Sequence, residues 1–137
     1  MDLLTDHDAA VDSHAKVLYI EDNPGNLSLM TSFFEEWERA TLVCCADGER
    51  GLAMAAEVLP EVILLDLNLP GISGFDVFQR LRQNEQTVQI PVIAVSADAM
   101  KQTFRRAGEL GFDGFLAKPV DFEQMKFLFE DLMETRQ

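Results

Sequence analysis

Charged and polar side chains follow apolar runs at four places in the sequence, and their types suit an ion or phosphate site. The run VILLD ends in Asp66, and KVLYI is followed directly by Glu21 and Asp22. Two later apolar runs end in Ser96 and in Lys118. Carboxylate oxygens are hard ligands that suit Mg²⁺, and a lysine at the same place supplies a fixed positive charge. A carboxylate in such surroundings can act as a nucleophile and take a phosphoryl group as an acyl phosphate.

Three carboxylates gathered at one point would repel one another strongly. Two unit charges ~4 Å apart interact by about 4 kcal/mol at an effective dielectric near 20. Three such groups could therefore cost on the order of 10 kcal/mol, which is comparable with the stability of a whole domain. Each residue also has a structural interpretation: Asp66 as a turn former, Ser96 as a helix N-cap, Lys118 as a solvated lysine. Their occurrence together favours a cation site.

Strand-like and helix-like segments alternate five times along the chain and place these residues at strand ends. Apolar, β-rich runs typical of strands cover residues 16–20, 41–45, 61–66, 90–96 and 111–117. Segments with helical spacing or capping residues cover 23–38, 47–59, 73–84, 98–110 and 121–135. This alternation predicts an α/β fold: a doubly wound (βα)5 sandwich with a five-stranded parallel sheet in the flavodoxin-like order 2-1-3-4-5. In such sheets the site lies beyond the carboxyl ends of the strands, where the winding direction reverses.

Composition and charge limit the classes of function. The chain has 137 residues, 47% hydrophobic and 26% charged, which is typical of one globular domain. Residues 1–15 hold four acids and no Lys or Arg, so we expect a flexible acidic tail followed by the domain over residues 16–137. The net charge of −13 argues against a nucleic-acid partner. The absence of a long apolar run or signal peptide predicts a cytoplasmic chain without a membrane partner.

Four segments together resemble the receiver domain of two-component response regulators, the CheY-like superfamily. They are LYIEDNPGN, VILLDLNLPGISGF, PVIAVSADAM and GFLAKPV, they occur in the family's order, and the likeness covers residues 16 to about 134. The resemblance implies that Asp66 accepts a phosphoryl group from a phosphohistidine. It also implies Mg²⁺ as cofactor, held by Asp22, Asp66 and the backbone carbonyl of Asn68, with Glu21 acting through water.

The resemblance assigns roles to the remaining site residues as well. Lys118 would pair with the phosphoryl oxygens, and Ser96, in place of the commoner Thr, would donate a hydrogen bond to one of them. Phe115 occupies the aromatic switch position, and the Lys118–Pro119 peptide bond would be cis. Such a chain is not an enzyme in the usual sense, because only its own phosphorylation and dephosphorylation are catalysed.

The resemblance further implies a surface that responds to phosphorylation. The modification adds roughly two negative charges, Ser96 moves toward them, and Phe115 turns inward. Helix 98–110, strand 111–117 and helix 121–135 would then present a changed surface to a downstream protein, and a homodimer through that surface is left open. The expected phosphoryl donors are a histidine kinase or a histidine phosphotransfer protein. Partner docking is expected on helix 23–38, where Leu29 and Phe33 lie off the core stripe, and on the loops that follow the strands at the same edge.

Three functional hypotheses remain open. The first is a stand-alone receiver or phosphorelay intermediate, which the starting Met and the acidic tail favour. The second is a receiver from a hybrid histidine kinase, which the same segments also resemble. The third is a Mg²⁺-dependent aspartyl phosphatase, disfavoured because such enzymes usually have a second Asp two residues after the nucleophile, where this chain has Asn68. A dinucleotide-binding enzyme is less favoured still, because no G-x-G-x-x-G follows the first strand.

Overall fold

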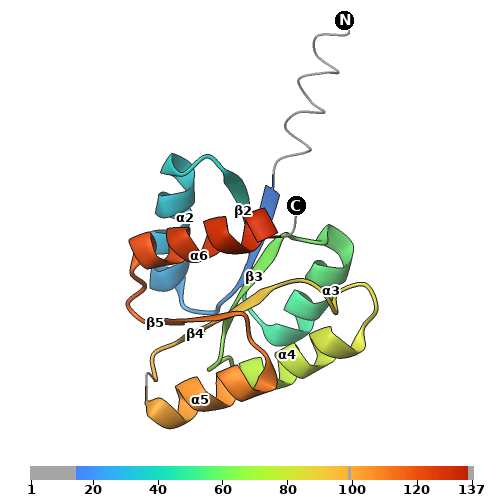
Figure 1. Cartoon of the computed structure of the whole chain (residues 1–137). Coiled ribbons are helices and arrows are strands. Elements are labelled where there is room, and N and C mark those ends of the chain that lie inside the picture. Colours follow the sequence, from blue (N-terminus) through green and yellow to red (C-terminus); the bar gives the residue numbers. More distant parts are fainter. Residues whose placement is uncertain (1–14, 99, 136–137) are drawn as a thin grey trace, which may run out of the picture.

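Strands and helices alternate along the chain as predicted. The computed structural model describes residues 15–98 and 100–135, and Figure 1 shows the elements in chain order. The strands are β1 (Ala15–Ile20), β2 (Ala40–Cys45), β3 (Val62–Asp66), β4 (Val92–Ser96) and β5 (Gly114–Ala117). The helices are α2 (Pro24–Glu36), α3 (Gly48–Val58), α4 (Gly74–Gln83), α5 (Lys101–Leu110) and α6 (Phe122–Thr135).

All five strands form one parallel sheet in the order β2-β1-β3-β4-β5, which confirms the predicted topology. β1 and β3 are neighbours, and Ile20 pairs with Leu65 in their register. The next residues along the two strands are Glu21 and Asp66. The register therefore brings both carboxylates to the same level at the carboxyl edge of the sheet.

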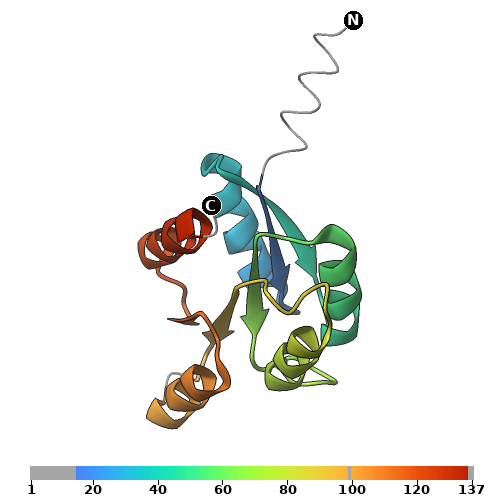
Figure 2. The ribbon, with the colours of Figure 1, turned by 45° about the vertical axis from the view of Figure 1, so that its right-hand side comes forward.

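Helices cover both faces of the sheet, and the strand alternation decides which residues meet which helix. Val17 and Tyr19 of β1 pack in one cluster with buried residues of α2 and α6. Leu18 and Ile20 point to the opposite face and pack with residues of α3 and α4. Successive side chains of a strand alternate between faces, so a residue two positions after Tyr19 returns to the α2 and α6 side. Figure 2 shows α2 beside α6, with α3 and α4 across the sheet from them.

Helix capping explains where two of the helices begin. The Asn23 side chain accepts a hydrogen bond from the Asn26 N–H at 2.9 Å, and Pro24 occupies the first helical position of α2. The Ser73 hydroxyl accepts from the Asp76 N–H at 3.2 Å and starts α4. Both caps were predicted from the sequence, because these residue types satisfy the first free N–H groups of a helix.

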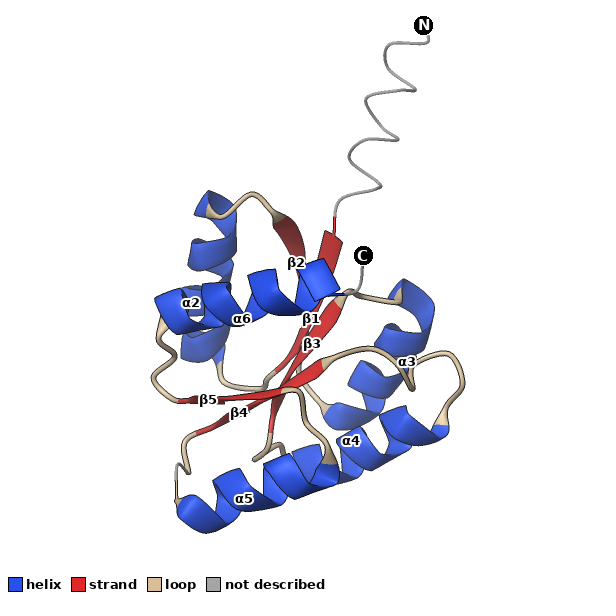
Figure 3. Cartoon of the chain, viewed as in Figure 1, coloured by secondary structure: helices blue, strands red, loops and turns tan. Residues whose placement is uncertain are grey.

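Two predicted boundaries around α5 were wrong by three residues each. The helix begins at Lys101 rather than at Asp98, and Figure 3 draws the residues that directly follow β4 in the colour of loops. Asp98 stays outside the helix because its side chain turns along the loop and accepts from the Met100 N–H at 3.0 Å. Strand β5 begins at Gly114 instead of Gly111, since Gly111 has φ +102° and ends α5 in a left-handed turn.

The predicted tail can be compared with the structure only at its last residue. β1 begins at Ala15, so that residue belongs to the sheet and not to the tail. Residues 1–14, the rest of the predicted tail, lie outside the described residues. Among the helices of residues 15–98 and 100–135, none has the length and hydropathy needed to cross a bilayer.

Candidate functional site

Three carboxylates converge at the carboxyl edge of the sheet, as the sequence predicted. Glu21, Asp22 and Asp66 each offer an oxygen, and these oxygens lie within 4.8 Å of one another. Glu21 is fully buried and Asp66 is 2% exposed, whereas Asp22 is exposed to solvent. Two of the three negative charges are therefore held out of water, which requires compensation by positive charge or hydrogen bonds.

Lys118 supplies a positive charge between the two buried carboxylates. Its Nζ lies 2.8 Å from Glu21 Oε1 and 3.2 Å from Asp66 Oδ2. The lysine follows β5 directly, and the Lys118–Pro119 peptide bond is cis. The Lys118 side chain is only 16% exposed. Burial alone would lower the pKa of Lys118, but the adjacent Glu21 and Asp66 outweigh it and raise that pKa, so the ammonium group stays charged.

Glu21 is the best stabilised carboxylate of the cluster. Its Oε1 accepts from the Tyr19 hydroxyl at 3.0 Å and the Asn26 side-chain amide at 3.3 Å, in addition to Lys118. Its Oε2 accepts from the Asn23 N–H at 3.0 Å. Burial favours the neutral form of Glu21, yet the bonds from Lys118 and the Asn23 N–H prevail and lower its pKa. Burial and the Glu21 carboxylate together raise the pKa of Tyr19, which keeps its hydroxyl as a donor.

Asp66 has fewer stabilising partners than Glu21. Its Oδ1 accepts from the Asn68 N–H at 2.9 Å, and its Oδ2 accepts from Lys118 at 3.2 Å. Burial raises the pKa of Asp66, and the nearby charge of Glu21 adds to that effect, although Asn68 and Lys118 oppose it. Asp66 is thus a buried carboxylate whose negative charge is incompletely compensated.

The donor set fits a hard divalent cation. Three carboxylates and one ammonium group leave two net negative charges on the cluster when all are ionised. Carboxylate and backbone oxygens, with water, are the ligands that Mg²⁺ prefers. The exposed Asp22 leaves the cluster open to solvent on one side. Since Glu21 already accepts four hydrogen bonds, it is better suited to contact an ion through water than directly.

Ser96 follows Val95, which pairs with Asp66 in the sheet register, but Ser96 forms no hydrogen bond with Asp66 among those of the described residues. The Ser96 hydroxyl is fully buried, accepts from the Asp98 N–H at 3.0 Å and donates to the Asp98 carbonyl at 3.2 Å. Asp98 also accepts from the Thr103 hydroxyl at 2.8 Å. This chain of bonds joins Ser96 to the first turn of α5, so Ser96 could not turn toward Asp66 without releasing that loop.

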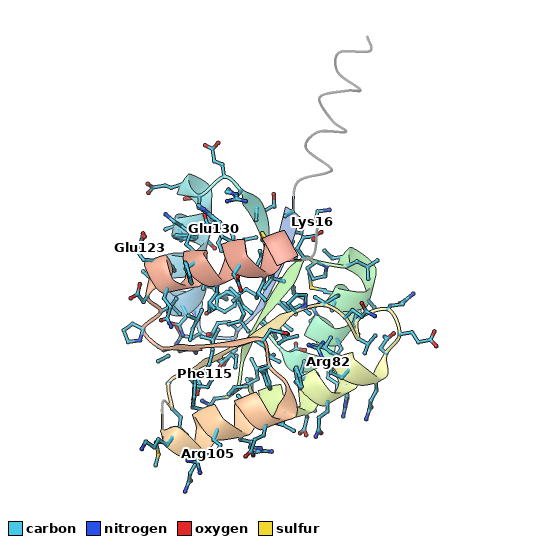
Figure 4. All side chains as sticks on the ribbon, in the orientation of Figure 1. Lys16, Arg82, Arg105, Phe115, Glu123 and Glu130 are labelled. Atoms are coloured by element: carbon cyan, nitrogen blue, oxygen red, sulfur yellow. The ribbon has the colours of Figure 1, made fainter. Side chains whose placement is uncertain are left out.

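The aromatic ring of Phe115 packs against α5 and against a small core cluster that contains Leu67 and Ala94. Phe115 is half-buried, and Figure 4 shows it between β5 and α5. Its ring meets Phe104 of α5 edge-to-face, with centroids 5.5 Å apart. Phe104 is itself 60% exposed. Phe115, predicted from the resemblance as a switch residue, therefore lies against a helix whose first turn is linked to Ser96 by hydrogen bonds.

A pocket of about 150 Å³ adjoins the cluster between α2 and the segment from β5 to α6. Lys118 and Tyr19 line it from the site, and Leu29, 58% exposed, lines it from α2. The prediction that Leu29 lies off the core stripe of the helix is confirmed, but the same prediction for Phe33 was wrong. Phe33 is half-buried because its ring stacks on Phe122 of α6, with centroids 5.0 Å apart.

Sequence reasoning missed two residues of the cluster, Tyr19 and Asn26. Tyr19 was interpreted only as a β-rich residue of strand 16–20, and Asn26 as part of a helix. A usable signal was present for Tyr19, because residues i and i+2 of a strand share a face, which places its hydroxyl on the side of Glu21. Asn26 gave no comparable signal, since its contact depends on how α2 packs against the sheet.

Comparison with known proteins agrees with this geometry. A family model described as "Response regulator receiver domain" matches residues 17–129. The DNA-binding dual master transcriptional regulator RpaA of Synechocystis sp. is 37% identical over 80% of this chain and 45% of its own length. The response regulator PleD of Caulobacter vibrioides is 36% identical over 78% of this chain and 23% of its own length. The polar-differentiation response regulator DivK of Brucella ovis is 36% identical over 76% of this chain and 84% of its own length.

The chain thus spans less than half the length of RpaA and PleD and most of the length of DivK. Solved structures show the same fold. The magnesium-bound receiver domain of sensor histidine kinase PA1611 from Pseudomonas aeruginosa has a TM-score of 0.81 at 23% identity, over 89% of this chain and 99% of that one. A response regulator from Desulfuromonas acetoxidans has a TM-score of 0.79 at 26% identity, over 88% and 98%.

Proposed function

Because this chain belongs to the response regulator receiver domain family of two-component signalling, we propose that Asp66 accepts a phosphoryl group from a phosphohistidine. The carboxylate oxygen attacks phosphorus, the P–N bond of the donor breaks, and the departing imidazole nitrogen keeps the bonding electron pair and takes up a proton. The observation that carries this proposal is Lys118 held between Glu21 and Asp66 at the carboxyl edge of the sheet. The donors are a histidine kinase or a histidine phosphotransfer protein.

We propose Mg²⁺ as the cofactor of this reaction. Asp22, Asp66 and the backbone carbonyl of Asn68 would hold it, with Glu21 acting through water. When bound, the ion neutralises charge on the phosphoryl oxygens and on the carboxylates. The net negative charge of the cluster supports this assignment, as does the magnesium ion in the cleft of the PA1611 receiver.

Lys118 and Ser96 would stabilise the phosphorylated form. Ser96 would also couple phosphorylation to a change at the start of α5. Lys118 is already within reach of Asp66 and would pair with the phosphoryl oxygens. Ser96 would leave its bonds to Asp98 and donate to a phosphoryl oxygen, which loosens the start of α5. Phe115 would turn into the space that Ser96 vacates and lose its contact with Phe104. The surface of α5, β5 and α6 would then change for a downstream protein or a second copy of the chain.

The phosphoryl donor would dock over the pocket beside α2. That pocket borders Lys118, so a protein bound there lies next to the acceptor carboxylate. Leu29 offers an exposed apolar side chain at its edge. We propose the cytoplasm as the location, because the proposed donors act there.

Two cellular contexts fit the proposed reaction, namely a regulator made of a receiver alone and a receiver within a hybrid histidine kinase. The 84% coverage of DivK supports the first.

The aspartyl phosphatase alternative gains no support, because Asn68 occupies the place of the second Asp and a carboxamide cannot act as the general acid for a leaving group. The proposed activity changes Asp66 of the chain itself rather than a separate substrate.

Acetyl phosphate and Mg²⁺ test the acceptor directly. The wild-type chain should acquire one phosphoryl group, seen by intact mass, and Asp66→Asn should acquire none. Asp76→Asn is the matched control, because Asp76 is a solvent-accessible carboxylate in the first turn of α4 and should leave labelling unchanged. Labelling that survives in Asp66→Asn would assign the acceptor to another residue and contradict the proposal.

A further inference from the structure

Tyr19 is a buried polar residue that the proposed reaction leaves without a role. Its ring is 1% exposed and packs in the cluster between the sheet, α2 and α6. Its hydroxyl donates to Glu21 Oε1 at 3.0 Å. Phenylalanine would fill the same apolar space, so packing alone does not require the hydroxyl. The only hydrogen-bond partner of that hydroxyl in residues 15–98 and 100–135 is the Glu21 carboxylate.

The tyrosine hydroxyl and Lys118 share one carboxylate oxygen. Glu21 Oε1 accepts from Tyr19 at 3.0 Å, from Asn26 at 3.3 Å and from Lys118 at 2.8 Å. Lys118 also reaches Asp66 Oδ2 at 3.2 Å, the longer of its two contacts. In the unmodified protein, the ammonium group is therefore held more closely by Glu21 than by the acceptor carboxylate.

We propose that Tyr19 is a positioning residue, whose hydroxyl keeps the Glu21 carboxylate oriented and hydrogen-bonded so that Lys118 can shift toward the phosphoryl group on Asp66. This inference rests on the proposed phosphoryl transfer. When a buried carboxylate loses one hydrogen-bond donor, its interactions with the remaining donors become stronger, because its charge is still out of water. Without the Tyr19 hydroxyl, Glu21 would hold Lys118 more tightly, and the shift of the ammonium group would cost more.

Tyr19→Phe tests this inference with the smallest change available, since only the hydroxyl is removed. The hydroxyl donates to a charged carboxylate, so part of the effect of losing this hydrogen bond should appear in the reaction rate. We expect the rate of Asp66 phosphorylation by acetyl phosphate at saturating Mg²⁺ to fall about three- to tenfold, each tenfold being about 1.4 kcal/mol. The folded state should persist, because the ring remains.

Thr87→Val is the matched control for losing a buried hydroxyl. Thr87 is 1% exposed, and its hydroxyl donates to the Leu81 carbonyl at 2.7 Å. It follows the C-terminal end of α4, whereas the site lies by the N-terminal end of that helix. The substitution should lower the free energy of unfolding and leave the phosphorylation rate within about twofold of wild type, a difference of less than about 0.5 kcal/mol.

A double-mutant cycle with Glu21→Gln separates positioning from packing. If the hydroxyl acts through the Glu21 charge, Tyr19→Phe should change both the rate and the free energy of unfolding much less in the Glu21→Gln background. The unfolding cycle needs no activity, so it remains decisive where Glu21→Gln reacts too slowly to measure. A wild-type-like rate for Tyr19→Phe, or an undiminished effect of Tyr19→Phe in Glu21→Gln, would overturn the inference. A wild-type chain that takes up no phosphoryl group would instead refute the proposed function.

Discussion

Glu21 and Asp66 carry the same charge in the same cluster but differ in the number of groups that stabilise it. Glu21 accepts four hydrogen bonds, from Tyr19, Asn26, Lys118 and the Asn23 N–H. Asp66 accepts two, and the longer one comes from Lys118. Burial therefore prevails at Asp66 and raises its pKa, whereas the donors prevail over burial at Glu21 and lower its pKa. The less stabilised anion is the one proposed to attack phosphorus.

This difference predicts how stability depends on pH in the absence of Mg²⁺. A raised pKa means that the folded state binds the Asp66 proton more tightly than the unfolded chain does. Its contribution to stability is therefore fully present below the ordinary Asp pKa of about 3.9. That contribution is lost as the pH rises through the raised pKa. We expect Asp66→Asn to be more stable than wild type at neutral pH, by a margin that grows above about pH 4.

Urea unfolding in EDTA at a series of pH values measures that margin. Asp76→Asn serves as the control for the change of an acid to its amide, because the Asp76 carboxylate is exposed to solvent and lies outside the cluster. A wild type that stays more stable than Asp66→Asn at every pH would show that the hydrogen bonds to Asp66 outweigh its burial.

Lys118 is expected to contribute more to stability than any exposed lysine. Lys118→Met leaves two buried carboxylates facing each other without their cation, which typically costs about 3–5 kcal/mol. Lys126→Met is the matched control, since Lys126 pairs with the 85% exposed Glu123 at 3.7 Å and should cost less than about 1 kcal/mol. Chemical denaturation at neutral pH compares the two variants. Equal losses would mean that the site does not depend on the lysine charge.

At the scale of elements, the start of α4 is packed directly against the end of β3. A Cβ at Gly74 would lie 2.4 Å from the Asp66 carbonyl oxygen and 2.6 Å from Leu67 Cα. These are backbone atoms, which cannot move aside without moving the strand end. The absence of a side chain at Gly74 thus allows α4 to start in contact with the backbone of Asp66 and Leu67. The position of the loop with Asn68, which contacts Asp66, depends on this close packing.

Gly74→Ala should therefore destabilise the fold and impair the site together. Overpacking of this kind costs about 1–3 kcal/mol, and the displaced strand end should slow phosphorylation of Asp66. Gly108→Ala is the control within a helix, because nothing lies within 4 Å of the place that its new methyl group would take. That substitution should be neutral or stabilise by up to about 1 kcal/mol. Urea unfolding and acetyl phosphate labelling of both variants test the contrast, which similar behaviour would contradict.

The sequence was sufficient for the topology and for most of the cluster because those features depend on local patterns. Asn23 and Ser73 mark helix starts by residue type, and the parallel order brings Glu21 and Asp66 together without further information. The remaining features depend on how segments pack against one another. Phe33 is half-buried only because Phe122 stacks on it. Likewise, α5 begins late because the Asp98 side chain bonds within the preceding loop.

At the scale of the whole molecule, the chain carries a large excess of acidic residues, and three of them form the cluster at the edge of the sheet. The chain has 24 acidic and 11 basic residues, with a net charge of −13. The parallel fold concentrates part of that charge, since it gathers three carboxylates within 4.8 Å at one edge of the sheet. A divalent cation could therefore act on this protein in two ways, by general screening or by binding at that edge.

Thermal unfolding with Mg²⁺ separates the two effects. At a concentration about tenfold above the dissociation constant, binding to the folded state alone should add about 1.4 kcal/mol, a rise in Tm of roughly 4–8 °C. NaCl at equal ionic strength should raise Tm much less, because it screens the charges without placing a divalent ion between the carboxylates. Asp22→Asn should remove most of the gain without disturbing the buried carboxylates, since Asp22 is exposed, and Asp76→Asn should keep it. An equal rise with NaCl, or in Asp22→Asn, would assign the effect to the overall charge of −13. The carboxylate cluster would then not be a preformed metal site.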